Sequence, residues 1–195
     1  MTNVAIFASG NGSNCENIIR HFSGSRDIRI ALVVCNREDA YVLTRARSLG
    51  VPAVVMPREE FKDEESLLGT MKRYGIGFIV LAGFLLMIPP FLVREYSRRI
   101  VNIHPALLPK YGGKGMYGRH VHEAVLAAGE TETGITVHYV SDVCDGGEII
   151  YQASVPVVPG CTAGDIAASV AALELRHFPE VIERTIRGGI AGGES

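Results

Sequence analysis

What the sequence lacks excludes several classes of protein. It has no tryptophan, and its four cysteines (Cys15, Cys35, Cys144 and Cys161) do not have the C-x-x-C spacing of a zinc or redox site. No run of about 18 apolar residues is present, so we expect no membrane-spanning helix. Nineteen Lys and Arg stand against 21 Asp and Glu, and no basic cluster indicates a nucleic-acid or membrane-surface partner. A small metabolite is the expected partner.

Apolar, β-branched runs alternate with helical segments through the first hundred of the 195 residues. This alternation is typical of a Rossmann-like, doubly wound α/β fold with a mostly parallel sheet. The later runs Gly134–Val140 and Glu148–Val155 favour an antiparallel C-terminal portion, and a long helix near 163–187 is expected to be interrupted at Pro179. The other expected strands are Val4–Ala8, Ile28–Cys35, Ala53–Met56, Gly77–Ala82 and Arg99–His104, and the other expected helices lie near Asn14–Phe22, Asp39–Leu49, Glu64–Tyr74, Pro90–Tyr96 and His120–Ala128.

The segment Ser9–Asn14 (SGNGSN) lies between the first expected strand and the first expected helix. Glycines let backbone N–H groups turn inward, and a helix N-terminus adds partial positive charge, so the segment predicts an anion site. Cys15 stands where a dinucleotide fingerprint has its third glycine, which favours a single phosphate over a dinucleotide. A tight turn with Ser or Asn as the helix cap is the alternative.

Asn102 and His104 stand at the end of the fifth expected strand. Residues two apart on a strand point to the same face, and Pro105 keeps His104 extended. Ligand crevices of open α/β sheets form at the carboxyl ends of the strands. A histidine there can exchange a proton near neutral pH, and a carboxamide can donate to an oxyanion. The alternative is a pair that only caps the strand end.

Two more segments have positions that suit a catalytic site. The turn Asp142–Gly147 can hold Asp145 in a cleft, where its carboxylate orients His104 or relays a proton, although such turns are most often structural. The uncharged run Leu81–Pro89 suits the wall of a site for a flat aromatic ligand, although most such runs are core. The remaining candidate metal ligands fit no zinc pattern, so no metal is expected; they are His120, His122 and His138.

In this order along the chain, the motifs resemble the folate-dependent formyltransferases. The segment Asn102–Tyr111 (NIHPALLPKY) is very specific to that family, and Leu81–Phe84 (LAGF) and the Asp-Gly-Gly turn at Asp145 accompany it. Ser9–Asn14 resembles the phosphate loop of the members that act on glycinamide ribonucleotide. The resemblance implies the formyltransferase fold and transfer of the formyl group of 10-formyltetrahydrofolate to the amine of glycinamide ribonucleotide in purine biosynthesis, by direct attack through a tetrahedral intermediate.

The resemblance also implies roles for particular residues. It implies Asn102, His104 and Asp145 as the catalytic group. We expect one domain of residues 1–195, with a phosphate-binding half (1–104) and a half that carries the folate loop and the C-terminal helix (105–195). Leu86 stands where some members carry Arg. The implied contacts with the substrate phosphate and ribose are Gly10, Asn11, Gly12, Ser13, Asn14 and, for the ribose, Glu174. The implied folate contacts are Leu86, Met87, Ile88, Val140, Ser141 and Asp142.

The expected partners are the two small molecules, and we expect no metal, nucleic acid or membrane to bind. The protein is expected to be cytoplasmic and to be a monomer or homodimer. Three alternatives remain: a formyltransferase for an amino-sugar nucleotide or initiator methionyl-tRNA, a 10-formyltetrahydrofolate hydrolase, and a non-enzymatic phosphate-ligand sensor. The enzyme that acts on tRNA needs an added basic domain. The hydrolase carries an extra N-terminal domain, whereas the first expected strand of this chain begins near residue 4. A sensor gives no reason for the residues of the catalytic group to occur together.

Overall fold

The strands form a seven-stranded sheet in the order β3-β2-β1-β4-β5-β6-β7. The computed structural model describes residues 1–191 of the chain, with side chains through residue 188. Parallel pairing of β1 with β2 and β4 and of β2 with β3, and antiparallel pairing of β6 with β7, confirm the predicted fold class. The strands are β1 (Thr2–Phe7), β2 (Ile28–Cys35), β3 (Ala53–Val55), β4 (Ile76–Leu81), β5 (Ile100–His104), β6 (Glu132–Tyr139) and β7 (Ile149–Pro156).

The predicted helices are present, with ends that shift by one to a few residues. The short helix α3 was not predicted, because four residues after Pro57 are too few to show a helical period. None of the helices in the described part of the chain has the length and apolarity needed to cross a bilayer. The helices are α1 (Ser13–Phe22), α2 (Val42–Ser48), α3 (Arg58–Phe61), α4 (Glu64–Arg73), α5 (Pro90–Glu95), α6 (Arg119–Ala127) and α7 (Ala163–Ala191).

The helix α7 runs through Pro179, so the predicted interruption is wrong. Proline removes one backbone N–H and normally breaks or kinks a helix. Here Phe178, Val181 and Ile182, on both sides of the proline, are at most 2% exposed. Burial of these apolar side chains is a tertiary stabilisation that the local sequence does not reveal, and it keeps the helix continuous.

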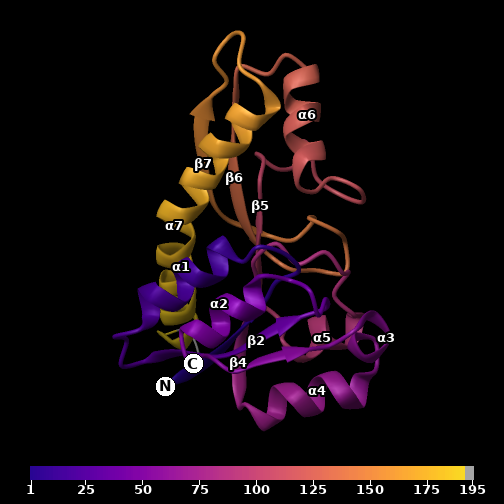
Figure 1. Ribbon diagram of the computed structural model, residues 1–195, viewed down its shortest axis with the longest axis vertical. Helices are drawn as coiled ribbons and strands as arrows, with labels where there is room; N and C mark the ends of the chain where they lie inside the picture. The colour runs from indigo at the N-terminus through magenta and orange to yellow at the C-terminus, as the bar shows by residue number, and fades with distance from the viewer. Residues whose placement is uncertain (192–195) are drawn as a thin grey trace. The chain divides into compact units, whose positions relative to one another are not determined.

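The contacts within the chain divide it into two compact units, with the boundary inside β5. Unit 1 is Met1–Val101 with the residues from Ile182 on, and unit 2 is Asn102–Val181. In unit 1, Val4–Phe7 are fully buried, and α1 buries Cys15, Ile18, Ile19 and Phe22 at helical spacing. Figure 1 shows α1 and α2 on one side of the unit 1 strands and α4 on the other. The single domain of residues 1–195 stays a prediction.

Unit 2 is organised by the β6–β7 pair and by one buried threonine. Thr136 is fully buried, and its hydroxyl donates to the Ala106 carbonyl (2.7 Å) and accepts from the Leu108 amide (3.0 Å). The Gln152 amide nitrogen on β7 donates to the same hydroxyl and to the Leu108 carbonyl. The segment that follows His104 is therefore fastened to the β6–β7 pair.

Gly134 on β6 allows the close pairing of this strand with β7. A Cβ there would lie 1.9 Å from the Ala153 carbonyl oxygen, whereas a Cβ at Gly69 in α4 would meet no atom within 4 Å. We expect Gly134→Ala to lower the free energy of unfolding by about 1–3 kcal/mol or more. The control Gly69→Ala should raise it by up to about 1 kcal/mol. Urea denaturation of both variants measures the difference, and equal stability of the two would contradict this account of the pairing.

Candidate active site

The structure brings the predicted catalytic residues together in unit 2. Asn102 and His104 are two apart on β5, and Asp145 reaches them from the turn after β6. The Asp145 Oδ2 atom lies 3.6 Å from His104 Nδ1, and its Oδ1 atom lies 3.5 Å from Asn102 Nδ2. His104 is only 3% exposed. Strand parity predicted that Asn102 and His104 share a face, and the Asp-Gly-Gly turn indicated Asp145; the catalytic role of all three stays a prediction.

The hydrogen bonds of His104 fix which ring nitrogen carries its proton. Nε2 lies 2.7 Å from the Tyr111 carbonyl oxygen, and a carbonyl only accepts, so Nε2 bears the hydrogen. Burial lowers the pKa of His104, and the nearby Asp145 carboxylate offsets only part of that effect. The neutral ring therefore presents an unprotonated Nδ1 next to Asp145, and this nitrogen is the one that can take a proton.

His138 on β6 is a further member of the site. Its Nδ1 donates to the Tyr139 carbonyl (2.9 Å), so its Nε2 accepts from Asn102 Nδ2 (3.1 Å). From the sequence, His138 was predicted only as a possible metal ligand, and this contact was missed. The available signal was that Thr136 and His138 alternate with the apolar Ile135 and Val137 and so share one face of the strand, which indicates buried polar groups with partners. Among the described residues, no three His, Cys, Asp or Glu side chains are placed to share a metal ion.

The surroundings of Asp145 favour its ionised, carboxylate form. Burial raises its pKa, but His138, the Gly113 amide and His104 together outweigh burial, so the pKa lies below its usual range. The Gly113 N–H donates to Oδ2 at 2.9 Å. A Cβ at Gly147 would lie 1.7 Å from the Tyr139 carbonyl oxygen, so this turn passes directly against the end of β6. The glycine is what lets the turn present Asp145.

The predicted phosphate loop lies in unit 1. Gly12, with φ +77°, is the N-cap of α1, and no side chain caps that helix in the described part of the chain. The N-cap is therefore a glycine, and the alternative of a Ser or Asn cap is wrong. Arg45 donates to the Asn11 carbonyl (2.9 Å) and pairs with Glu16. Arg45 thus fastens the loop by its backbone, while its charge is paired with the Glu16 carboxylate.

Ser9 connects this loop with the apolar segment after β4. It is 2% exposed, and its hydroxyl donates to Asn36 Oδ1 (2.6 Å) and accepts from the Leu85 amide (2.9 Å). Its amide donates to the Gly83 carbonyl (3.1 Å). One buried hydroxyl therefore fixes the start of the predicted phosphate loop relative to the start of the predicted folate segment.

Comparison with known proteins gives the family. The family model described as formyl transferase matches residues 2–182. This chain belongs to the formyl transferase family. The phosphoribosylglycinamide formyltransferase of Escherichia coli K12 is 37% identical over 92% of this chain and 85% of its own length. The chloroplastic phosphoribosylglycinamide formyltransferase of Arabidopsis thaliana is 39% identical over 92% of this chain, and the chain spans only 63% of that protein.

Solved structures of family members have the same fold. Glycinamide ribonucleotide transformylase 1 from Symbiobacterium toebii has a TM-score of 0.87 at 33% identity, covering 96% of this chain and 89% of that one. Phosphoribosylglycinamide formyltransferase from Coxiella burnetii has a TM-score of 0.85 at 40% identity, covering 96% and 88%. The predicted formyltransferase fold is therefore confirmed.

The other residues implied by the family resemblance are divided between the units. The first folate segment follows β4 in unit 1, where Met87 is 62% exposed, and Val140–Asp142 follow β6 in unit 2. Glu174 lies half-buried on the part of α7 that belongs to unit 2. An apolar side chain as exposed as that of Met87 is available to a ligand, which is consistent with a folate contact. These contact roles remain predictions.

The hydroxyl of Ser9 should contribute to stability. Ser9→Ala leaves the Asn36 amide oxygen and the Leu85 N–H without their partner, so we expect the free energy of unfolding to fall by about 1–3 kcal/mol. The matched control is Ser48→Ala, which removes an exposed hydroxyl bonded to the Arg45 carbonyl. The control should stay within about 0.5 kcal/mol of the wild type in urea denaturation. Equal losses for the two variants would show that the buried position of Ser9 is unimportant.

Stability should also depend on pH through two buried histidines. Burial lowers the pKa of His104 and, together with the nearby His104, that of His122. The unfolded chain binds protons below about pH 6.5, where the folded rings resist protonation. The free energy of unfolding should therefore fall between pH 7 and pH 5, by at most about 1.4 kcal/mol per pH unit for each ring. Urea denaturation across this range tests the sign, and a rise toward pH 5 would contradict it.

Proposed function

We propose that this chain transfers the formyl group of 10-formyltetrahydrofolate to the amine of glycinamide ribonucleotide, a step of purine biosynthesis. The observation that carries the proposal is the grouping of half-buried Asn102 and Asp145 around buried His104 in a member of the formyl transferase family. Relatives named phosphoribosylglycinamide formyltransferase support this acceptor. The protein is expected to act in the cytoplasm, as a monomer or homodimer and without a metal.

In the proposed reaction, the unprotonated amine attacks the formyl carbon and forms a tetrahedral intermediate. The new C–N bond moves the carbonyl electrons onto oxygen, and an N–H of Asn102 stabilises this oxyanion. One Asn102 N–H is held by His138 at 3.1 Å. The other faces Asp145 at 3.5 Å, the limit of a hydrogen bond, so it is the one free to turn to the oxyanion.

His104 carries the proton of the attacking amine, and Asp145 assists it. Nδ1 of His104 accepts it, directly or through a water, and the Asp145 carboxylate stabilises the imidazolium. When the bond from carbon to N10 of the folate breaks, the same proton passes to N10. The cycle leaves the enzyme unchanged and needs no covalent intermediate. Binding both reactants side by side supplies further rate by making the step effectively intramolecular.

The two substrates are assigned to the segments that suit them chemically. The substrate phosphate is assigned to backbone N–H groups of Gly12, Ser13 and Asn14, where the N-terminus of α1 is positive, with Gly10 and Asn11 completing the loop. The flat pterin ring, which needs both apolar and backbone polar contacts, is assigned to Leu86–Ile88 and Val140–Asp142, and the ribose to Glu174. Each assignment rests on the family resemblance together with the local geometry.

The direct test measures 10-formyltetrahydrofolate deformylation by spectroscopy, with and without glycinamide ribonucleotide. We expect turnover only when the ribonucleotide is present, with formylated product in equal amount. Turnover without it, releasing formate, would identify a hydrolase. No turnover with this amine would overturn the proposal and favour another acceptor or a phosphate-ligand sensor.

Loss of the Asn102 donor should affect the rate more than the fold. Asn102→Ala removes the proposed oxyanion donor, and such losses cost roughly 10²–10³ in rate. The matched control is Asn3→Ala, whose amide donates to the Tyr74 carbonyl in unit 1 and should leave kcat unchanged. Steady-state kinetics on folded protein compares them. Wild-type turnover by Asn102→Ala would exclude Asn102 from the chemistry.

A further inference from the structure

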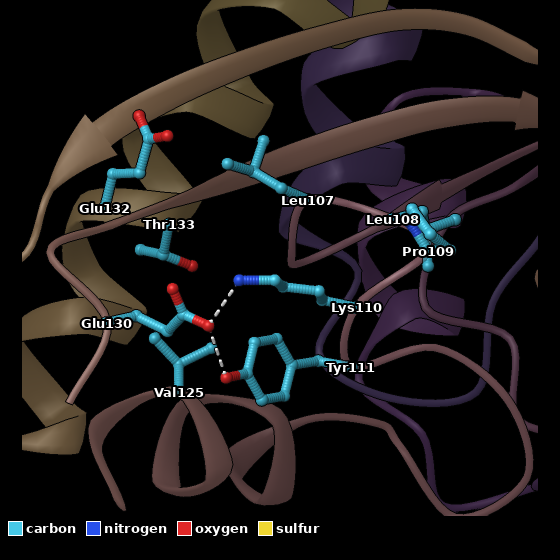
Figure 2. Close-up of a pocket in the computed structure, with 9 residues that line it drawn as sticks. All are labelled: Leu107, Leu108, Pro109, Lys110, Tyr111, Val125, Glu130, Glu132 and Thr133. Atoms are coloured by element: carbon cyan, nitrogen blue, oxygen red, sulfur yellow. Dashed lines mark hydrogen bonds and ion pairs between the residues drawn. The ribbon is translucent and has the colours of Figure 1, made fainter. Parts of the chain in front are cut away.

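Tyr111 connects His104 with the ion pair of Lys110 and Glu130. Its backbone carbonyl accepts from His104 Nε2 at 2.7 Å, and its phenol donates to Glu130 Oε1 at 2.8 Å. Lys110 also donates to Glu130 Oε1 at 2.8 Å, and Figure 2 shows both side chains turned toward this carboxylate. Lys110 and then Tyr111 lower the pKa of Glu130, so it is an ionised acceptor at neutral pH.

The backbone of Tyr111 has an unfavourable conformation that its surroundings must hold in place. Its φ is +57°, a left-handed conformation that a residue with a Cβ rarely adopts unless its surroundings impose it. The ring lines a cavity of about 250 Å³ together with Val125 and Thr133, so close packing alone does not fix it. The hydrogen bond to Glu130 is the directional contact that does.

The segment after Tyr111 is fitted tightly against the catalytic group. A Cβ at Gly112 would lie 2.5 Å from Leu108 Cδ2 and 3.4 Å from Asp145 Cβ, and the Gly113 amide donates to Asp145. A displaced Tyr111 would therefore disturb both His104 and Asp145.

Two acceptors compete for the single proton of the neutral His104 ring. The Tyr111 carbonyl is 2.7 Å from Nε2, and the Asp145 carboxylate is 3.6 Å from Nδ1. A hydrogen bond to a carboxylate is roughly twice as strong as one to a neutral carbonyl, but only at hydrogen-bond distance. The carbonyl wins here because it is closer. If it moved away, the proton would transfer to Nδ1 and the unprotonated nitrogen would face away from Asp145.

We propose that Tyr111 is a positioning residue: Glu130 holds its ring, and its carbonyl keeps His104 as the Nε2–H tautomer, with Nδ1 ready to accept a proton beside Asp145. The effect on catalysis rests on the proposed function, whereas the tautomer does not. The other titratable groups that face His104 are Asp145 and His138, and His122 on α6.

The experiment uses ¹⁵N-histidine-labelled full-length protein, with the His104 signals assigned by comparison with His104→Gln. Wild-type protein should show protonated Nε2 and unprotonated Nδ1. Tyr111→Phe and Glu130→Ala should each shift the ring toward the Nδ1–H form. They should also lower kcat by about 10- to 100-fold at little change in KM, the scale expected for a displacement near 1 Å. The low-pH limb of the kcat profile should move as well.

Two control variants separate positioning from general damage. Glu130→Gln keeps an acceptor for the Tyr111 phenol and should restore most of kcat and the wild-type tautomer. Lys110→Met removes only the exposed ion pair and should resemble the wild type. The proposal is overturned if Tyr111→Phe keeps the Nε2–H form and wild-type kcat, or if Lys110→Met loses as much as Glu130→Ala. If the wild type lacks formyl transfer but the variants still shift the tautomer of His104, only the proposed function is overturned.

Discussion

A carboxylate that is largely removed from water has to be hydrogen-bonded if it is to stay ionised, and the candidate site is built around that requirement at the half-buried Asp145. The Gly113 amide donates to it, and Asn102, His104 and His138 lie within 3.6 Å of it. β5, β6 and the loop after β5 therefore converge on one group. Among the described residues, the basic side chains within 4 Å of it are the imidazoles of His104 and His138, which pair with it as ions only when protonated, and not Lys or Arg. Its charge thus remains available to stabilise a proton on a neighbouring ring.

Much of the site is readable from the sequence, because strand parity is a local property. Parity placed Asn102 and His104 on one face, and the turn glycines indicated Asp145. The contact between Asn102 and His138 could not be read, because it depends on how β6 is placed beside β5. The tautomer of His104 depends on the Tyr111 carbonyl, a backbone atom that every residue possesses. Family resemblance supplied the substrates, which no pattern in the chain specifies.

The fold follows the same division between local and distant causes. Continuous apolar runs such as Val4–Ala8 predicted buried parallel strands, with ends within two residues of the observed strand Thr2–Phe7. Pro179 misled the prediction because a local rule was outweighed by burial of Phe178 and Ile182. The four-residue helix α3 was too short for any periodic signal. The boundary between the two compact units lies inside β5, and it could not be predicted because no linker of distinct composition marks it.

Unit 1 is discontinuous, and this has a consequence for synthesis on the ribosome. The chain leaves the unit after Val101 and returns at Ile182, where buried Ile182 and Ile186 and the ion pairs His21–Glu183 and Asp27–Arg187 complete it. At about 5–20 residues per second, the intervening residues take roughly 4–16 s to emerge. During that time strands such as β1 and β2 are exposed without their last partners. We therefore expect the yield of folded protein to depend on translation speed and on chaperones that bind the exposed apolar strands.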